Sequence, residues 1–265
     1  MFNVDQYAYS NRLRVVHPGE KFTFAILTMV ICLGSPSMVT PLVIVFLMAG
    51  TVIFRAGIPW RIYLKLMSLP ASFLVIGVAT VALSISRHPQ NMLYGITLGG
   101  VAIGVAADDL GTAANLFCKS LGAVSCLYFL SLTTPMVEFM LVLRRLGLPS
   151  LLIELMSLIY RFIFVLLKTA DDIYTAQSSR LGYISCKRSY LSLGQLAANL
   201  FIKAYTSSQI LYTTLSSRCY TGELKVLETH YPVSRKNIIV MAIVDLLLAL
   251  ITLSDGGGIF GKIHN

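Results

Sequence analysis

A long uncharged stretch near the start of the chain, residues 22–54, most limits what this sequence can fold into. It exceeds the roughly 20 apolar residues with which one helix crosses a bilayer, and a Gly-Ser-Pro sequence at residues 34–36 interrupts it. We therefore predict two membrane spans, at residues 22–33 and 39–54, joined by an uncharged turn on the outer side. The composition agrees, because 56% apolar and 12% charged residues would leave a soluble protein without a polar surface.

Three further apolar stretches, residues 67–85, 113–132 and 238–253, are also predicted to span the membrane. Residues 92–107 are apolar but short and rich in glycine, so we predict a re-entrant or outer-leaflet segment there. The predicted fold is an all-α polytopic membrane protein with about five transmembrane helices and a cytoplasmic module of amphipathic helices.

The basic residues follow the loops on one side of this arrangement. All of the 21 Lys and Arg residues except Arg87, Lys119 and Lys262 fall on that side when the spans are threaded through a bilayer. This is the positive-inside pattern, which places that side and the N-terminus in the cytoplasm. We interpret the net charge of +9 as topology and expect a lipid bilayer but no nucleic acid as partner.

Residues 135–237 differ from the spans, because charged side chains interrupt their apolar faces. The segments 137–146 and 151–168 are apolar along one side, which is typical of helices on a membrane surface or within a protein module. Leucine and alanine recur at three- or four-residue steps over residues 193–216, which predicts an amphipathic helix about 36 Å long. We predict N-terminal transmembrane helices (1–134), a cytoplasmic module (135–237), and a C-terminal transmembrane helix with a tail (238–265).

Few residues suggest chemistry of the chain's own. Residues 256–262 match the G-x-x-x-x-G-K half of a phosphate-binding loop, but Ile263 replaces the Ser or Thr that would bind magnesium. No Ser/His/Asp set or pair of catalytic carboxylates can be assembled, and the five cysteines and four histidines lack metal-ligand spacing. We expect no enzymatic activity, bound cofactor or metal. Asp245, within the last span, either hydrogen-bonds a neighbouring helix or lines a substrate path.

Two short segments of similar sequence, residues 177–183 and 215–223, stand out from the rest. Each places small residues and then an arginine near the end of a predicted helix. One interpretation is helix capping, in which glycine takes a left-handed conformation and arginine complements the helix dipole. The other assigns the arginines a functional contact. The candidate site residues are Arg180, Arg218, Ser179, Ser217, Gly182, Tyr220 and Gly222, with Arg161 and Arg188 as secondary candidates.

Several motifs together, in their order and spacing, resemble one known family. They are residues 5–11 with Lys21, Leu-Thr-Thr-Pro at 132–135, Leu-Arg-Arg-Leu-Gly-Leu-Pro at 143–149, Tyr-Arg-Phe-Ile at 160–163, and the two arginine segments. The chain resembles the transmembrane (T) component of energy-coupling factor (ECF) transporters, and within it the cobalt-type CbiQ branch, over nearly its whole length. The family's paired Ala-Arg-Gly motifs differ here, because Leu181 and Cys219 stand in place of glycine.

The resemblance implies a division of labour among several proteins. Two cytoplasmic ABC-type ATPases would bind ATP and magnesium, and the amphipathic coupling helices of this chain would transmit their movement to a separate substrate-binding membrane (S) subunit. Arg180 and Arg218 would each enter a groove on one ATPase, because a guanidinium makes paired hydrogen bonds with carboxylates or carbonyls. The expected function is the coupling subunit of a cobalt or nickel importer in the cytoplasmic (inner) membrane of a prokaryote.

Two alternatives stay open. The same scaffold would serve a vitamin importer equally well, because the S subunit chooses the substrate. A polytopic membrane enzyme acting on lipid headgroups would need acidic or histidine residues clustered at one membrane depth. The nearest candidates, Asp108, Asp109 and Asp245, lie in unrelated segments.

Overall fold

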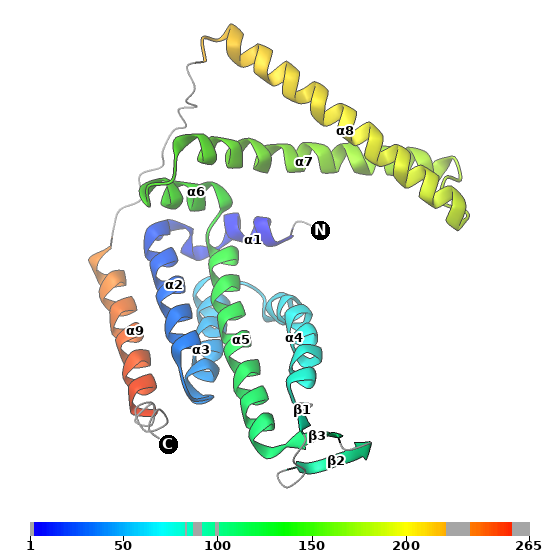
Figure 1. The fold of residues 1–265 in the computed structure, drawn as a ribbon. Helices are drawn as coiled ribbons and strands as arrows, with labels where there is room; N and C mark the ends of the chain where they lie inside the picture. The colour runs from blue at the N-terminus through cyan, green and yellow to red at the C-terminus, as the bar shows by residue number, and fades with distance from the viewer. Residues whose placement is uncertain (1–2, 83, 87–91, 99–100, 221–233, 256–265) are drawn as a thin grey trace. The chain divides into compact units, whose positions relative to one another are not determined.

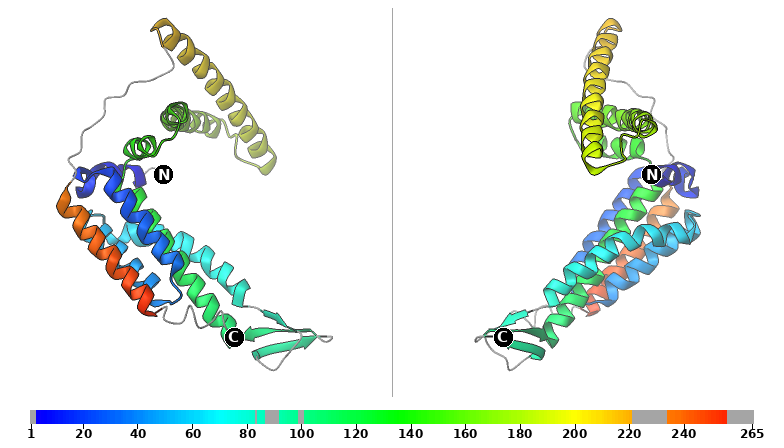
Figure 2. Two further views of the ribbon diagram at one scale, coloured as in Figure 1. Left: turned by 60° about the vertical axis from the view of Figure 1, so that its left-hand side comes forward. Right: turned by 90° about the vertical axis from the view of Figure 1, so that its right-hand side faces the viewer.

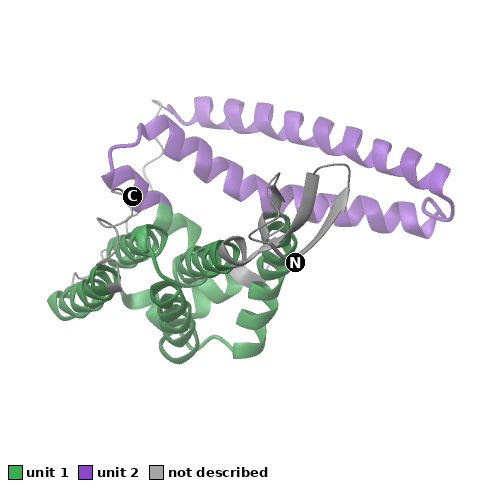
Figure 3. Cartoon of the chain, turned by 60° about the horizontal axis from the view of Figure 1, so that its bottom comes forward, with its two compact units in different colours: residues 1–139, 230–265 green, residues 140–229 purple. Residues whose placement is uncertain are grey.

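The structure, a computed structural model, describes residues 3–82, 84–86, 92–98, 101–220 and 234–255, with the backbone alone over the described part of residues 81–110. The chain forms two compact units, residues 1–139 with 230–265 and residues 140–229 (Figure 3). The predicted division after residues 134 and 237 stays a prediction. Each unit is described by itself below.

The first unit consists mainly of helices. Pro18 begins α2 at a position that needs no backbone N–H, and the ring Nδ1 of the preceding His17 accepts from the Gly19 N–H at 3.0 Å. The elements are α1 (Asn3–Ser10), the 3-10 helix η1 (Arg12–Val15), α2 (Pro18–Gly34), α3 (Val39–Gly50), the π-helical turn η2 (Thr51–Arg55), α4 (Trp60–Ala82), α5 (Ala107–Thr133) and α9 (Arg235–Asp255).

Helices of membrane-spanning length confirm the predicted all-α polytopic class. Among the residues that the structure describes, four helices are long and apolar enough to cross a bilayer, and the shorter apolar helix Val39–Arg55 matches the second predicted span. The four are Trp60–Thr80, Gly111–Thr133, Ser150–Ser179 and Arg235–Ser254. The third of these contains the segment 151–168 that the sequence predicted to be a shorter amphipathic helix.

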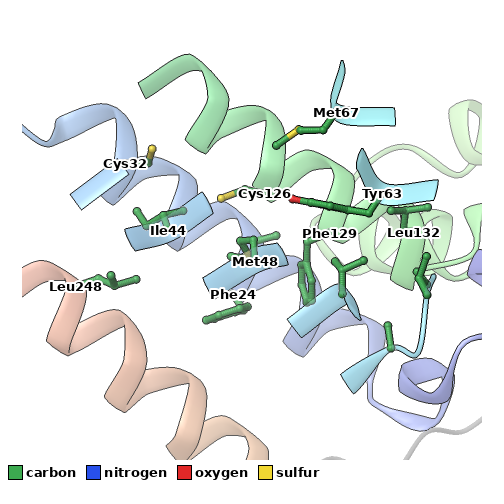
Figure 4. Close-up of a cluster of buried hydrophobic side chains, with 14 residues drawn as sticks. Phe24, Cys32, Ile44, Met48, Tyr63, Met67, Cys126, Phe129, Leu132 and Leu248 are labelled. Carbon is green, nitrogen blue, oxygen red and sulfur yellow. The ribbon is translucent and has the colours of Figure 1, made fainter. Parts of the chain in front are cut away.

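Helix α5 packs against α2, α3 and α4, and α9 packs against α2 (Figures 1 and 2). The rings of Phe24 in α2 and Phe129 in α5 meet edge to face, with their centroids 5.8 Å apart. Figure 4 shows the buried core that these helices enclose. Its labelled side chains are Phe24, Cys32, Ile44, Met48, Tyr63, Met67, Cys126, Phe129, Leu132 and Leu248.

Two residues, Gly122 and Asp245, lie where helices of this bundle come close together. A Cβ added at Gly122 of α5 would collide with the Cys32 sulfur of α2 and would lie 3.4 Å from the Pro41 carbonyl of α3. Asp245 of α9 is hydrogen-bonded to Thr28 of α2, with 2.9 Å between Oδ1 and Oγ1. This contact supports the interpretation of Asp245 as a helix-to-helix hydrogen-bonding residue.

A small antiparallel sheet lies between α4 and α5, where the sequence predicted a longer span and a re-entrant segment. Its strands are β1 (Ser84–Ser86), β2 (Met92–Leu98) and β3 (Val101–Ala106), in the order β1-β3-β2. The register pairs Ile85 and Ile96 with Ile103. Residues 101–106 alternate β-branched and small residues, a period-two pattern that favours a strand. Helix α4 accordingly ends at Ala82, and the described part of residues 92–107 contains strands.

The second unit is dominated by two long helices, α7 (Ser150–Ser179) and α8 (Cys186–Ser217), which follow the short helix α6 (Met136–Arg145). They form a hairpin, in which the chain reverses direction at the turn that joins them and the two helices diverge away from that turn (Figure 1). Helix α8 begins seven residues before the predicted residue 193, because the Ser185 side chain accepts a hydrogen bond from the Arg188 N–H at 3.4 Å and caps it. No residue of α7 is buried, and in α8 only Ser192 is.

Candidate functional site

Arg180 is the C-cap residue of α7. The N–H of Gly182 donates to the Gln177 carbonyl at 2.8 Å, and the N–H of Leu181 donates to the Ser178 carbonyl at 3.0 Å. These two bonds define a Schellman motif, which satisfies the last carbonyls of a helix. Leu181 has a φ of 59°, in the left-handed region that usually requires glycine.

Arg218 occupies the same position at the end of α8. The N–H of Tyr220 donates to the Leu215 carbonyl at 3.1 Å, and the N–H of Cys219 donates to the Ser216 carbonyl at 3.2 Å. Cys219 has a φ of 57°. The two arginine segments therefore form the same backbone structure.

The serine before each arginine also makes the same bond in both segments. Ser179 Oγ donates to the Thr175 carbonyl at 2.9 Å, and Ser217 Oγ donates to the Thr213 carbonyl at 2.8 Å. The sequence carries a matching signal, a repeated Thr-x-x-x-Ser-Arg pattern. Both α7 and α8 are therefore capped at their C-terminal ends. The left-handed residue is Leu181 in one cap and Cys219 in the other, and not the glycine that the capping interpretation assumed.

The turn between α7 and α8 is held by a group of side chains around Gly182. Gln177 Nε2 donates to the Ser192 carbonyl at 3.0 Å, and Ser192 Oγ donates to the Gly182 carbonyl at 2.8 Å. The Tyr183 hydroxyl donates to Gln177 Oε1 at 2.7 Å. A Cβ at Gly182 would lie 2.8 Å from both the Gln177 carbonyl oxygen and Ser192 Oγ, so only glycine fits there.

Tyr220 fixes the other end of the hairpin. Its hydroxyl donates to Glu154 Oε2 at 2.6 Å, which ties the end of α8 to the second turn of α7. Arg218 therefore lies by the start of α7, whereas Arg180 lies at its end. At 1.5 Å per residue, the part of α7 between Glu154 and Arg180 is about 40 Å long, so the two arginines are presented far apart.

The secondary candidates are separated from each other. Arg188 lies in the first turn of α8, at the same end of the hairpin as Arg180, and Arg161 lies near the middle of α7. All four arginines have exposed side chains. Gly222 lies outside the described residues. Glu154, Gln177 and Ser192 were not predicted from the sequence. Glu154 contacts a residue 66 positions away, and Gln177 and Ser192 meet only because the chain turns between α7 and α8.

Metal-ligating side chains do not gather in the described part of the chain. Among those residues, no group of three or more His, Cys, Asp or Glu side chains is placed to hold a metal ion. The partial phosphate-binding-loop match at residues 256–262 lies outside the description. The described features that set this chain apart are therefore its membrane helices and its exposed hairpin with two equivalent arginine caps.

Comparison with known proteins identifies the family. The sequence model of the CbiQ cobalt transport proteins matches residues 9–231. The chain belongs to the CbiQ family. A CbiQ cobalt transport protein of Salmonella typhimurium is 34% identical over 84% of this chain and 99% of its own length.

Two other relatives extend this comparison. An uncharacterized protein of Methanocaldococcus jannaschii is 38% identical over 94% of this CbiQ-family chain and 91% of its own length. A putative fused cobalt transport protein CbiMQ of Methanocorpusculum labreanum is 31% identical over 83% of this chain, which spans 36% of that longer protein. Family membership and the apolar helices make this chain a multi-pass membrane component of a transport system.

Proposed function

We propose that this chain is the transmembrane coupling subunit of an ECF-type importer, in which it transmits the movement of two ABC-type ATPases to a separate S subunit. The observation that carries the proposal is the equivalence of the Arg180 and Arg218 caps at opposite ends of an exposed helical hairpin. Two equivalent arginines suit two equivalent grooves on a pair of ATPases. ATP and magnesium belong to those ATPases in this proposal.

Arginine suits such a contact because its planar fork pairs with carboxylates or carbonyls and keeps its charge when partly desolvated. Truncating one partner of a buried charged pair at an interface costs about 2–5 kcal/mol. The Schellman bonds hold the backbone of each arginine, so the side chain projects from a fixed position. The hairpin also presents the two arginines about 40 Å apart along α7, which leaves room for one ATPase at each.

The charge pattern supports a cytoplasmic position for the hairpin and the N-terminus. Helix α7 is long and apolar enough to cross a bilayer, but its exposed surface carries Arg161, Lys168, Asp171 and Asp172. A charged residue at the centre of a membrane helix costs about 2.5–3.5 kcal/mol on insertion scales. We therefore propose that α7 and α8 lie on the cytoplasmic side, where basic residues accumulate in membrane proteins. The membrane would be the cytoplasmic membrane of a prokaryote.

The proposed substrate is cobalt, with nickel as the closely related possibility. The support is the family itself, together with the relatives named as cobalt transport proteins. A vitamin importer with the same coupling mechanism is the alternative, because in this proposal the S subunit selects the substrate. An independent membrane enzyme is the remaining alternative.

Co-purification of the tagged chain from its native membrane tests the proposal. We expect mass spectrometry to find ABC-type ATPases and a small membrane protein, and metal analysis to find cobalt or nickel in the intact complex. A vitamin in place of the metal would keep the mechanism and change the substrate. Absence of any ATPase, or catalytic activity of the purified chain alone, would contradict the coupling function.

A further inference from the structure

The inner core of the first unit contains a group of charged and polar side chains that the arginine site does not explain. Lys21 of α2 is 1% exposed, and its Nζ donates to the Thr133 carbonyl at 3.0 Å. Asn11 Nδ2 lies 3.2 Å from the Leu132 carbonyl oxygen and 3.3 Å from that of Thr133. Both side chains thus satisfy carbonyls at the C-terminal end of α5, where a positive charge also complements the helix dipole.

Glu20, the neighbour of Lys21, holds a second segment of the chain. Its Oε1 accepts a hydrogen bond from the Ser234 N–H at 3.1 Å, immediately before α9 begins. Glu20 and Glu138 are both buried. Lys21 precedes the apolar stretch of α2. Its burial lowers its pKa to about 8. The nearby carboxylates of Glu138 and Glu20 act in the opposite direction, because they favour the charged ammonium.

These contacts lie next to the two points where the chain passes between the first and the second unit. The second unit comprises residues 140–229, so the chain leaves the first unit after residue 139 and returns to it at residue 230. Lys21 and Asn11 hold the chain at Thr133, shortly before it leaves. Glu20 holds it at Ser234, shortly after it returns. Adjacent residues of one helix, Glu20 and Lys21, thus anchor both connections.

We propose that Asn11, Glu20 and Lys21 form a clamp that fixes both chain connections of the α7–α8 unit to the membrane helices. The clamp holds Thr133 and Ser234 against α2, so movement of that unit that reaches either residue passes into α5 and α9. This inference rests on the proposed coupling function. The three clamp residues are positioning residues and touch neither ATP nor the transported substrate.

The inference is tested with the whole transporter in proteoliposomes, by measuring substrate uptake per ATP hydrolysed. Lys21→Met removes the ammonium group, and Glu20→Ala removes the acceptor for the Ser234 N–H. We expect either variant to bind the ATPases and hydrolyse ATP but to lower the uptake per ATP about tenfold. Lys21→Arg and Glu20→Gln, which keep a donor and an acceptor, are expected to recover much of that ratio.

Lys65→Met is the matched control, because Lys65 is exposed on α4 and lies outside the clamp. Thermal unfolding of each complex shows whether a variant has lost stability as well as coupling. The ratio of uptake to ATP hydrolysed is measured only for complexes that assemble. If Lys21→Met does not assemble, the Glu20→Ala and Glu20→Gln pair decides the question. Unchanged uptake per ATP in Glu20→Ala, or failure of Glu20→Gln to recover a lowered ratio, would overturn the clamp alone. A wild-type chain that binds no ATPase would instead overturn the coupling function on which the clamp depends.

Discussion

Leu181 and Cys219 have nearly the same backbone conformation, with φ values of 59° and 57°, at the same position after two helices. Each follows an arginine C-cap and donates its N–H into a Schellman motif. The left-handed conformation costs a residue with a Cβ about 1–2 kcal/mol, so both sites hold strain that glycine would not. Leu181 and Cys219, which stand where the family motif has glycine, thus take the left-handed conformation that glycine adopts easily.

Replacing Leu181 or Cys219 with glycine is expected to stabilise the hairpin. The relief of left-handed strain exceeds the greater conformational freedom of glycine in the unfolded chain, so we expect a gain of about 1 kcal/mol at each site. Hydrogen exchange of the last turns of α7 and α8 measures this gain. Leu191→Gly, at an exposed position inside α8, is the control and should destabilise by a similar amount. Faster exchange in both cap variants would contradict the strain argument.

Charge reversal at either arginine cap is expected to weaken ATPase binding. Arg180→Glu or Arg218→Glu should cost about 2 kcal/mol or more, which is roughly thirtyfold in affinity, because a buried charged contact is replaced by repulsion. Titration of the purified ATPases measures the affinity, and transport assays measure uptake.

Two further variants separate the contact from capping at these arginines. Glutamate also opposes the helix dipole, whereas Arg180→Gln and Arg218→Gln leave that dipole without an added negative charge. Lys203→Glu, at an exposed position on α8, is the control for a general change of charge. Normal affinity and uptake in both reversed variants would refute the proposed contact.

Gly182→Ala is expected to disrupt the turn between α7 and α8. Its new Cβ would lie 2.8 Å from the Gln177 carbonyl oxygen and Ser192 Oγ, so the turn must open and Arg180 must shift. We expect a loss of about 1–3 kcal/mol in local stability and weaker ATPase binding. Hydrogen exchange at residues 177–192 reports the stability. Gly194→Ala, where a Cβ meets nothing within 4 Å, should have no such effect.

Gly122→Ala is expected to destabilise the membrane bundle. The added methyl collides with the Cys32 sulfur, and the core between α5 and α2 must separate at a cost of about 1–3 kcal/mol. Thermal unfolding in detergent measures the loss. Cys32→Ala in the same chain removes the colliding sulfur and should recover part of the lost stability. The double variant should then be more stable than the sum of the two single changes predicts. Gly77→Ala in α4, with open space around the new Cβ, is the control.

The membrane helices could be predicted because hydrophobicity over about 20 residues is a local property of the sequence. Their ends were harder to predict. Helix α2 begins at Pro18, ahead of the predicted residue 22, because the His17 side chain caps it and Pro18 fits its first turn. Strands β2 and β3 were not predicted because a short glycine-rich apolar run fits a strand or a re-entrant segment equally well.

The functional role of the candidate site residues stays a prediction, and their backbone geometry was not predicted. The repeated small-small-Arg pattern pointed to Arg180 and Arg218. The pattern did not show that Leu181 and Cys219 take the left-handed conformation, since residues with a Cβ rarely do. Nor did it indicate Glu154, because its contact with Tyr220 joins residues 66 positions apart.

The sequence by itself determined the membrane class, the places of the apolar helices and the two arginines, because each follows from composition or from spacing along the chain. Tertiary structure alone decided the contacts of Lys21 with Thr133, of Glu20 with Ser234 and of Asp245 with Thr28. These contacts join residues more than a hundred positions apart. Buried polar groups require partners, but which partner each one finds depends on how the helices pack.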